Sequence, residues 1–528
     1  MAERNSQGHP RIYYLHHRVA GPAGRLPEML DHAADLGFTH VLLSPPYQAG
    51  RLGDVFFPVA HDSADAALGT DLSASALIAD VAKAAKDRGL ALLLDLAPQQ
   101  FALEHPFVEE EPDSFTVRRE VAGGPVDPRL PGTPQGSAWS RLDPRSVNRL
   151  QAFWAPRLAE YAASGVAGFR AVRPTQASAG LWREMIAQAR KSAPDCLFIA
   201  DTTGLPRSDA LALEGCGFSY VLSSLPWWDY QSSWLVEEYE ALSVVAPVMA
   251  MPEAPFATRL AERVRDSRGL REAYTRALSA AAALGCGMLV PVGFEHISRR
   301  PLDATQSGPE DYDRAVAEAP FAFADVVRRI NALLGESKAL RKPGRLRPLT
   351  GPSAKVTGIL RTPAYPRVSE EALLLLVNPD LLEPHDITSS KLRPQMGGEF
   401  GAFTEFMGGE GGRTAQDVIT LAPGEALIAR ADRAKPVRLP RQTGKRVPKA
   451  AGASPRIIVD GLAPAVDGGR YPVKGIVGDA LVVEADALMD GHEVLGVELQ
   501  WRARDEEIWK RARMAPLGND RFRGTLHL

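Results

Sequence analysis

Apolar and polar positions along the first third of the chain repeat one pattern of apolar strand, polar loop, amphipathic helix and apolar strand. In residues 73–95, apolar side chains recur at helical spacing after Ser73, Gly89 stops the helix, and an unbroken leucine run ends at Asp95. A strand without polar positions is typical of a parallel sheet that is buried on both faces. The pattern therefore predicts an α/β fold in which helices cover a parallel sheet.

Eight such strands precede residue 335, and eight is the number that closes a (β/α)8, or TIM, barrel. They are expected near residues 11–19, 39–46, 91–97, 168–172, 196–202, 218–225, 246–252 and 286–292. Helices are expected between the strands, for example over 147–163 and 270–284, and a last helix over 321–334 ends the barrel. Residues 106–145 are rich in proline, glycine and charge, which predicts an excursion above the barrel.

After residue 335 the helical spacing disappears, and short β-prone runs separated by turn residues predict a β-sandwich over 336–432. A basic segment follows over 433–455. Between Arg433 and Arg456 the sequence has eight Lys or Arg residues, four prolines and no acid, which predicts a linker. An arm that binds nucleic acid is the less favoured alternative, because interleaved aromatic residues are missing. Residues 456–528 are expected to form a second β-sandwich-like domain.

Composition then excludes several partners. The 61 Lys and Arg residues nearly balance 64 Asp and Glu residues, so no net field directs the chain to nucleic acid or to an anionic membrane. No apolar run reaches the roughly 20 residues of a membrane helix, and the first residues lack the apolar core of a signal peptide. The three cysteines lie far apart, which fits buried reduced thiols. We therefore predict a cytoplasmic protein with no cofactor, no metal ion, and neither nucleic acid nor membrane as partner.

The reactive groups of a TIM barrel lie just past the carboxyl ends of its strands. The sequence places there Asp95 after the third strand, Arg170 on the fourth, Asp201 after the fifth, Glu253 after the seventh and Glu295-His296 after the eighth. Acids at several strand ends favour glycosyl chemistry, in which one carboxylate attacks the anomeric carbon and another protonates the leaving oxygen. The alternative, favoured for any single acid, is that it caps a helix or pairs with an arginine.

At these positions the sequence resembles the α-amylase superfamily and, within it, the bacterial α-1,4-glucan:maltose-1-phosphate maltosyltransferases. The segments are LLLDLAPQQFALEHPFVEEEPDSF (92–115), GVAGFRAVRP (165–174), CLFIADTTGLPR (196–207), MAMPEAPF (249–256) and GMLVPVGFEH (287–296). They look like the motifs of strands 3, 4, 5, 7 and 8 of that family, in the same order. The most specific match is RIIVDGLAPAVDGGRYPVKGIVGDALVVEADALMDGHEVL followed by APLGNDRFRG, which resembles the N-terminal domain of the maltosyltransferases.

The three catalytic positions that the resemblance implies have all changed. The strand-4 motif of the family reads Phe-Arg-x-Asp with the Asp as nucleophile, and Val172 stands here instead. The acid/base is a Glu in the family and Asp201 here, which withdraws the carboxyl by about 1.5 Å. The third acid is an Asp in the family and Glu253 here. We therefore expect no sugar transfer by the family mechanism, and by strand alternation we expect Arg173 to point away from the side of Val172.

A cleft without chemistry can still bind sugar. Trp227 and Trp228 cluster after the sixth strand, and Phe56 and Phe57 follow the second, on the face where sugar rings would stack. Asp95 and Arg170 are the expected hydrogen-bonding partners of the sugar hydroxyls. The alternative is that these rings only cover the tops of helices, and the sequence leaves both interpretations open.

The resemblance implies a part of a maltosyltransferase polypeptide that elongates α-glucan such as glycogen. This barrel would be noncatalytic, would take an α-glucan or maltosyl ligand, and would act beside a catalytic barrel in the same polypeptide. In the family the domain that 456–528 resembles precedes that barrel, so we expect the natural polypeptide to continue beyond Leu528. Two alternatives are an active α-glucan hydrolase or transferase that uses Asp201 and Glu253, and an interaction module without affinity for glucans.

Overall fold

A computed structural model describes residues 9–118, 127–129, 136–264, 267–336, 343–363, 371–392, 400–407, 418–433, 457–489 and 494–528. The basic segment predicted over 433–455 lies almost wholly outside these residues. No helix within the described ranges is long and apolar enough to cross a bilayer.

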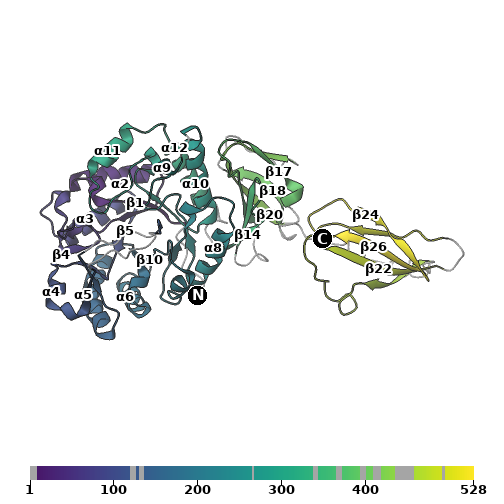
Figure 1. Cartoon of the computed structure of the whole chain (residues 1–528), viewed down its shortest axis with the longest axis horizontal. Helices are drawn as coiled ribbons and strands as arrows, with labels where there is room; N and C mark the ends of the chain where they lie inside the picture. Colours follow the sequence, from purple (N-terminus) through teal and green to yellow (C-terminus); the bar gives the residue numbers. More distant parts are fainter. Residues whose placement is uncertain are drawn as a thin grey trace.

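The first unit is an eight-stranded parallel barrel, which confirms the predicted fold class (Figure 1). In sheet order its strands are β12 (Val248–Met249), β11 (Tyr220–Leu222), β10 (Leu197–Ala200), β9 (Gly168–Ala171), β5 (Ala91–Leu96), β2 (His40–Leu43), β1 (Arg11–Leu15) and β13 (Met288–Pro291). A parallel bridge between Ala250 and Met288 joins the two ends of this order and closes the barrel. Each strand is shorter than its predicted range, because the flanking apolar residues continue into buried loops.

Helices surround the strands, as the helical spacing predicted (Figure 1). They are α1 (His17–Ala20), α2 (Leu26–Asp35), α3 (Ala74–Lys86), α5 (Pro144–Ala163), α6 (Ala179–Ser192), α7 (Arg207–Leu211), α8 (Trp234–Val245), α9 (Leu260–Arg263), α10 (Leu270–Leu284), α11 (Pro309–Ala317) and α12 (Ala324–Glu336). The hydroxyl of Ser73 accepts a hydrogen bond from the backbone N–H of Ala76 and caps the first turn of α3. Beyond its last turn, Gly89 takes a φ of +72°, a conformation that favours glycine.

Two small sheets lie on the loops that follow β2 and β5. One pairs β3 (Tyr47–Ala49) with β4 (Pro58–Ala64), and the other joins β6 (Gln100–Ala102), β8 (Ser137–Ser140) and β7 (Phe115–Arg118). Helix α4 (Pro106–Glu110) belongs to the same excursion. The excursion predicted over 106–145 is thus present in its described part and ends in the first turn of α5.

The second unit is built on a five-stranded antiparallel sheet. The sheet runs β14 (Gly344–Pro348), β15 (Thr357–Pro363), β16 (Glu371–Val377), β20 (Ala426–Arg433) and β18 (Phe400–Met407), with β17 (His385–Thr388), β19 (Val418–Leu421) and helix α13 (Ser389–Leu392) beside it. Leu374 and Leu376 of β16 point into the core of this unit, whereas Leu373 and Leu375 join the core of the barrel. Strand β16 is apolar without interruption because both of its faces are buried.

Two arginines connect this sheet to the barrel. Arg361 of β15 donates hydrogen bonds to the backbone oxygens of Gly285 (2.6 Å) and Ala283 (3.2 Å) at the end of α10. Arg276 of α10 donates to the backbone oxygen of Pro379 at 2.6 Å. Guanidinium groups satisfy the free carbonyls at a helix C-terminus, so the two units share a buried and hydrogen-bonded boundary.

The third unit has a four-stranded antiparallel sheet and a two-stranded ribbon. The sheet runs β21 (Ile457–Ala463), β22 (Ala480–Met489), β26 (Arg521–His527) and β25 (Ala515–Gly518), and the ribbon pairs β23 (Glu498–Trp501) with β24 (Lys510–Arg513). Its buried apolar cluster consists of Ala487, Met514 and Phe522, with three partly buried side chains packed against them, and Val483, Ala485 and Leu526 are also buried. Of the twenty-four exposed large apolar side chains in the described part of the chain, sixteen lie in this unit.

We expect this third unit to exchange its amide hydrogens first. A small apolar core gives little protection against local opening, and the buried clusters of the other two units are much larger. Hydrogen–deuterium exchange followed by mass spectrometry checks this, with peptides from 457–489 and 494–528 expected to label before peptides from β5 and β16. Slower labelling of β22 than of β16 would contradict the expectation.

Candidate functional site

A cleft of about 400 Å³ lies at the carboxyl ends of the barrel strands. Its lining comes from the strand ends and the segments that follow them, including Arg170, Val172 and Arg173 at the end of β9, Asp201 and Thr203 after β10, Trp227 after β11, and residues 251 and 254–257 after β12. The loop between β3 and β4, residue 100, Arg129 and residues 302–305 complete it. A volume of this size lies in the range of small-molecule sites, roughly 300–1,000 Å³.

A buried ion pair lies beneath this cleft. Adjacent parallel strands place Asp95 of β5 directly beside Arg170 of β9. The guanidinium Nε and Nη2 atoms of Arg170 donate to the two carboxylate oxygens at 2.6 and 2.8 Å, and the hydroxyl of Tyr14 donates to Oδ2 at 3.0 Å. Burial alone would lower the pKa of Arg170, but the charge and hydrogen bonds of Asp95 raise it above its ordinary value. Burial raises the pKa of Asp95, against the opposing effect of Arg170.

Only one member of this pair reaches the cleft. Arg170 is among the lining residues, and its Nη1 lies 3.6 Å from Asp201 Oδ2. Asp95 is 2% exposed and is engaged by Arg170 and Tyr14. The predicted role of Asp95 as a sugar ligand therefore does not fit its position, because its oxygens already accept buried hydrogen bonds.

Val172 stands at the position that the sequence resemblance pairs with the nucleophile of the family, and it lines the cleft. Its backbone is held in place, because its N–H donates to Leu96 O at 2.9 Å and the N–H of Asp201 donates to Ala171 O at 3.0 Å. These backbone hydrogen bonds fix the positions of the ends of β5, β9 and β10 relative to one another. The side chain at this position is an isopropyl group, which has no carboxylate.

The expectation that Arg173 points away from Val172 is wrong. Strand β9 ends at Ala171, and Arg173 has a φ of +50°, so strand alternation does not extend to it. Both residues line the cleft. Burial lowers the pKa of Arg173 to about 10, against the opposing charge of Asp54. The guanidinium also lies over the ring of Trp139, 5.3 Å from its centroid.

The two predicted acids at strands 5 and 7 have different surroundings. Asp201 faces the cleft with 24% of its side chain exposed. Glu253 is fully buried and outside the lining, where Arg259 Nη1 donates to it at 2.7 Å. The other carboxylate oxygen accepts from the backbone N–H of Leu260 at the start of α9. A catalytic role for Glu253 does not fit this position. Its carboxylate caps the start of α9 and pairs with the buried guanidinium of Arg259.

The aromatic residues divide in the same way. Trp227 is partly exposed and lines the cleft, whereas its neighbour Trp228 is 4% exposed and donates its indole N–H to Ser232 O at 2.8 Å. Phe56 meets Phe256 edge to face across the cleft wall, with ring centroids 5.3 Å apart. Phe57 also contributes to the lining but is 2% exposed. A surface for stacking is therefore available on Trp227, Phe56 and Phe256, and the predicted stacking role of Trp228 does not fit.

Several lining residues were not found from the sequence, because they lie on loops far from any strand end. Asp54 is the most notable, since burial raises the pKa of its carboxyl and its Oδ1 accepts from the N–H of Phe56 at 2.8 Å. Asp303 lines the opposite side but accepts three hydrogen bonds from its own turn, from Thr305 and Gln306. Phe256 has a φ of +63°, a strained conformation that often marks functional positions.

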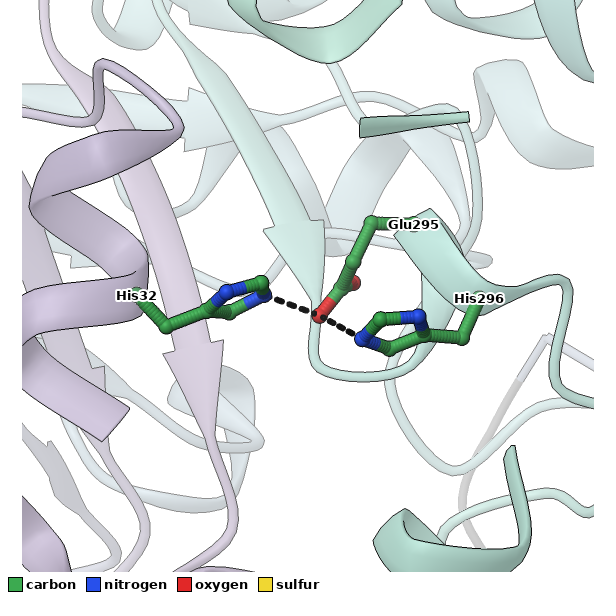
Figure 2. A group of neighbouring side chains, drawn as sticks. All are labelled: His32, Glu295 and His296. Atoms are coloured by element: carbon green, nitrogen blue, oxygen red, sulfur yellow. Dashed lines mark hydrogen bonds and ion pairs between the residues drawn. The ribbon is translucent and has the colours of Figure 1, made fainter. Parts of the chain in front are cut away.

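A second polar cluster lies outside the cleft lining and joins His32, Glu295 and His296 (Figure 2). His32 Nε2 is 3.1 Å from Glu295 Oε1, and His296 Nε2 is 3.7 Å from the same oxygen. Burial alone would raise the pKa of Glu295, but hydrogen bonds and the neighbouring imidazoles lower it to about 2. The sequence predicts Glu295 and His296 just after the eighth strand, but it does not indicate that His32 lies beside them.

Known structures share the fold of the first two units. The α-amylase of Geobacillus thermoleovorans superposes with a TM-score of 0.63 at 14% identity, over 80% of this chain and 98% of the amylase. An α-amylase from Lactobacillus plantarum has a TM-score of 0.59 at 16% identity, over 81% and 99% of the two chains. The barrel with its following β-sheet unit is therefore of the α-amylase type in fold.

Sequence comparison gives a narrower relationship. Residues 455–528 match the family of domain N/S of α-1,4-glucan:maltose-1-phosphate maltosyltransferases. The maltosyltransferase of Burkholderia pseudomallei is 32% identical over 98% of this chain and 47% of its own length, and the second such enzyme of Streptomyces coelicolor is 26% identical over 74% and 60%. The chain is therefore a relative of the α-1,4-glucan:maltose-1-phosphate maltosyltransferases, and it spans about half the length of the Burkholderia protein.

Proposed function

We propose that this chain is a noncatalytic, glucan-binding part of a polypeptide that elongates α-glucan from maltose 1-phosphate. The relationship to the maltosyltransferases supports the reaction, and the residue at position 172 carries the assignment of this barrel as noncatalytic. A cytoplasmic location goes with this proposal.

Glycoside transfer through the family mechanism needs a nucleophile and an acid/base on opposite sides of the scissile bond. Val172 supplies no nucleophile, and Glu253 and Asp95 are buried in ion pairs outside the cleft lining. Asp201 is the one strand-end acid of the sequence prediction that lines the cleft. One partly exposed carboxylate beside Arg170 can accept hydrogen bonds from hydroxyl groups without performing both steps of the reaction.

The cleft is suited to sugars in other respects. Trp227, Phe56 and Phe256 offer ring faces and edges to the apolar faces of a pyranose, while Asp201, Gln100 and Arg129 offer acceptors and donors for hydroxyls. An apolar wall with a few polar groups is the usual composition of a small-molecule site. These features support an α-glucan or maltosyl ligand.

A working hydrolase or transferase is the second candidate, and one observation favours it. Asp54 lines the same cleft as Asp201, so two carboxyl groups are present, and burial raises the pKa of Asp54. A rearranged mechanism would have to use these two residues instead of Asp201 and Glu253. An interaction module without glucan affinity is the third candidate.

Two assays on the intact chain separate the three candidates. Retention on glycogen in affinity electrophoresis, with no phosphate released from maltose 1-phosphate, is the result that we expect. Turnover that is lost in both Asp201→Asn and Asp54→Asn would favour the hydrolase or transferase. If the chain shows neither retention nor turnover, the interaction module remains as the explanation.

Trp227→Ala is expected to weaken binding to glycogen about fivefold, because one stacking contact contributes about 1 kcal/mol. The matched control is Trp509→Ala, which removes a half-exposed tryptophan of the third unit. Trp228→Ala is not suitable for this test, because that ring is buried. Equal retention of the Trp227 and Trp509 variants would remove the stacking role.

The partner that we propose for this chain is a catalytic maltosyltransferase barrel of the same polypeptide. The exposed apolar side chains of β21, which include Ile458, Val459 and Leu462, support a contact with another protein surface. The Burkholderia relative, of which this chain spans 47%, is long enough to hold such a barrel.

A further inference from the structure

The His32, Glu295 and His296 cluster brings together two segments that are distant in the sequence. His32 lies on α2, Glu295 and His296 lie on the short helix η7 (Phe294–His296) after β13, and Tyr312 of α11 borders the group. Figure 2 shows the Nε2 edges of both imidazoles turned toward the Glu295 carboxylate from opposite sides. The cluster therefore presents two nitrogen donors and one oxygen donor to a single point.

The distances fit one ion. One donor atom from each residue lies within 4.8 Å of the others. Two ligands of one tetrahedral Zn²⁺ at about 2.0–2.2 Å are about 3.4 Å apart. The Nε2 atoms of His32 and His296 lie 3.1 and 3.7 Å from Glu295 Oε1, so a rotation of the side chains is required only to adjust the remaining separations. The imidazoles are free to make it, because the His32 and His296 side chains are 24% and 18% exposed.

A second observation points to a missing ligand. Glu295 Oε1 accepts hydrogen bonds from the Tyr13 hydroxyl at 2.6 Å and from His32, whereas Oε2 is buried and has no hydrogen-bond partner among the residues that the structure describes. The Glu295 side chain is 1% exposed, so water does not compensate this oxygen freely. A buried carboxylate oxygen without a partner is costly, and a cation that the carboxylate binds through both oxygens would satisfy it.

We propose that His32, Glu295 and His296 form a site for one zinc ion, outside the cleft and independent of the proposed glucan binding. Two imidazoles and one carboxylate suit a borderline cation such as Zn²⁺, whereas Mg²⁺ and Ca²⁺ prefer sets made of oxygen. Both histidines bind through Nε2 in the neutral form. The fourth position is open to solvent or to the hydroxyl of Tyr312, which lies 3.3 Å from His296 Nε2.

The surroundings give the site a structural role. Tyr13 of β1 holds the carboxylate from behind, as hydrogen-bonded neighbours of metal ligands usually do. An ion here links α2, which follows the first strand of the barrel, to the segment that follows its last strand. Zinc here would therefore connect the segments that follow β1 and β13, which are the first and last barrel strands in the chain and pair with each other.

The test uses the intact, untagged chain after dialysis against EDTA, because a histidine tag would itself bind zinc. Calorimetric titration with ZnCl2 is expected to give one site per chain, and CoCl2 is expected to give the intense visible bands of a tetrahedral site. His32→Ala and His296→Ala should each abolish this stoichiometric binding. His527→Ala, which removes an exposed histidine of β26, is the matched control and should retain it.

Two further measurements remain decisive if a variant folds poorly. Tyr13→Phe keeps all three ligands and is expected to weaken zinc binding about 10–100-fold. In the unmodified chain, zinc should slow amide exchange in α2 and in residues 294–297. The proposal is overturned if the chain binds no stoichiometric zinc, or if the His32, His296 and His527 variants bind it equally.

Discussion

The intact chain is expected to release no phosphate from maltose 1-phosphate in the presence of glycogen, and no reducing ends from glycogen alone. Deleting a catalytic nucleophile typically lowers the rate by about 10⁴ to 10⁶-fold, and Val172 removes the nucleophile of the family mechanism. Phosphate release is measured against a maltosyltransferase with an intact Phe-Arg-x-Asp motif. Activity within about a hundredfold of that enzyme would contradict the noncatalytic assignment.

Restoring one carboxylate is not expected to restore this activity. Val172→Asp places an acid beside Arg173, but the acid/base position still holds Asp201, whose carboxyl is one methylene short of the family residue. Val172→Asn is the matched control, because it has the same shape without the charge. Activity in Val172→Asp but not in Val172→Asn would show that the nucleophile alone is missing and that the shorter Asp201 is sufficient.

Arg170→Met is expected to lower the free energy of unfolding by about 3–5 kcal/mol. The substitution leaves the buried carboxylate of Asp95 with the Tyr14 hydroxyl alone, and breaking a buried ion pair typically has a cost of this size. Urea denaturation followed by tryptophan fluorescence measures it. A second variant, Arg170→Met with Asp95→Leu, should recover most of the loss, because it removes the unpaired charge.

The control for this variant is Arg88→Met. Arg88 pairs with Asp31 at 2.7 Å on the surface, where solvent screens the interaction, so little change in stability is expected. If Arg170→Met were no more destabilising than Arg88→Met, the buried pair of Arg170 and Asp95 would contribute no more to stability than a surface ion pair. In that case the glucan-binding measurements could be made on Arg170 variants without concern for folding.

The fold could be predicted from the sequence because its signals are local. The run from Leu92 to Asp95 predicts a buried strand and the position of its carboxyl end. Eight runs of this kind predict the barrel. The β-prone run over 372–377 predicts a strand but not its place, because an apolar sequence does not reveal which surfaces bury its two faces. In the structure those surfaces are the barrel and the core of the second unit.

The site could be predicted only as far as the strand ends define it. Position 172 and Asp201 were located in this way, and Arg170 reaches the cleft as predicted. The burial of Glu253 could not be predicted from the sequence. It depends on the ion pair with Arg259, which forms because the loop after β12 turns back on itself. Trp227 and Trp228 are adjacent in sequence and face different environments, and only the path of the backbone separates their roles. Asp54 and Phe256 reach the cleft from loops whose course carries no periodic signal.

The shared boundary between α10 and the five-stranded sheet has a consequence for any dissection of this molecule. The sequence predicts a domain boundary between residues 335 and 336. Leu373, Leu375 and Ile428, which follow this boundary, nevertheless belong to the same apolar cluster as the barrel helices. A fragment cut there would expose these leucines and strip Arg361 from the last carbonyls of α10. The barrel and the five-stranded sheet therefore have to be inherited, transplanted or expressed as a pair if this apolar surface is to stay covered.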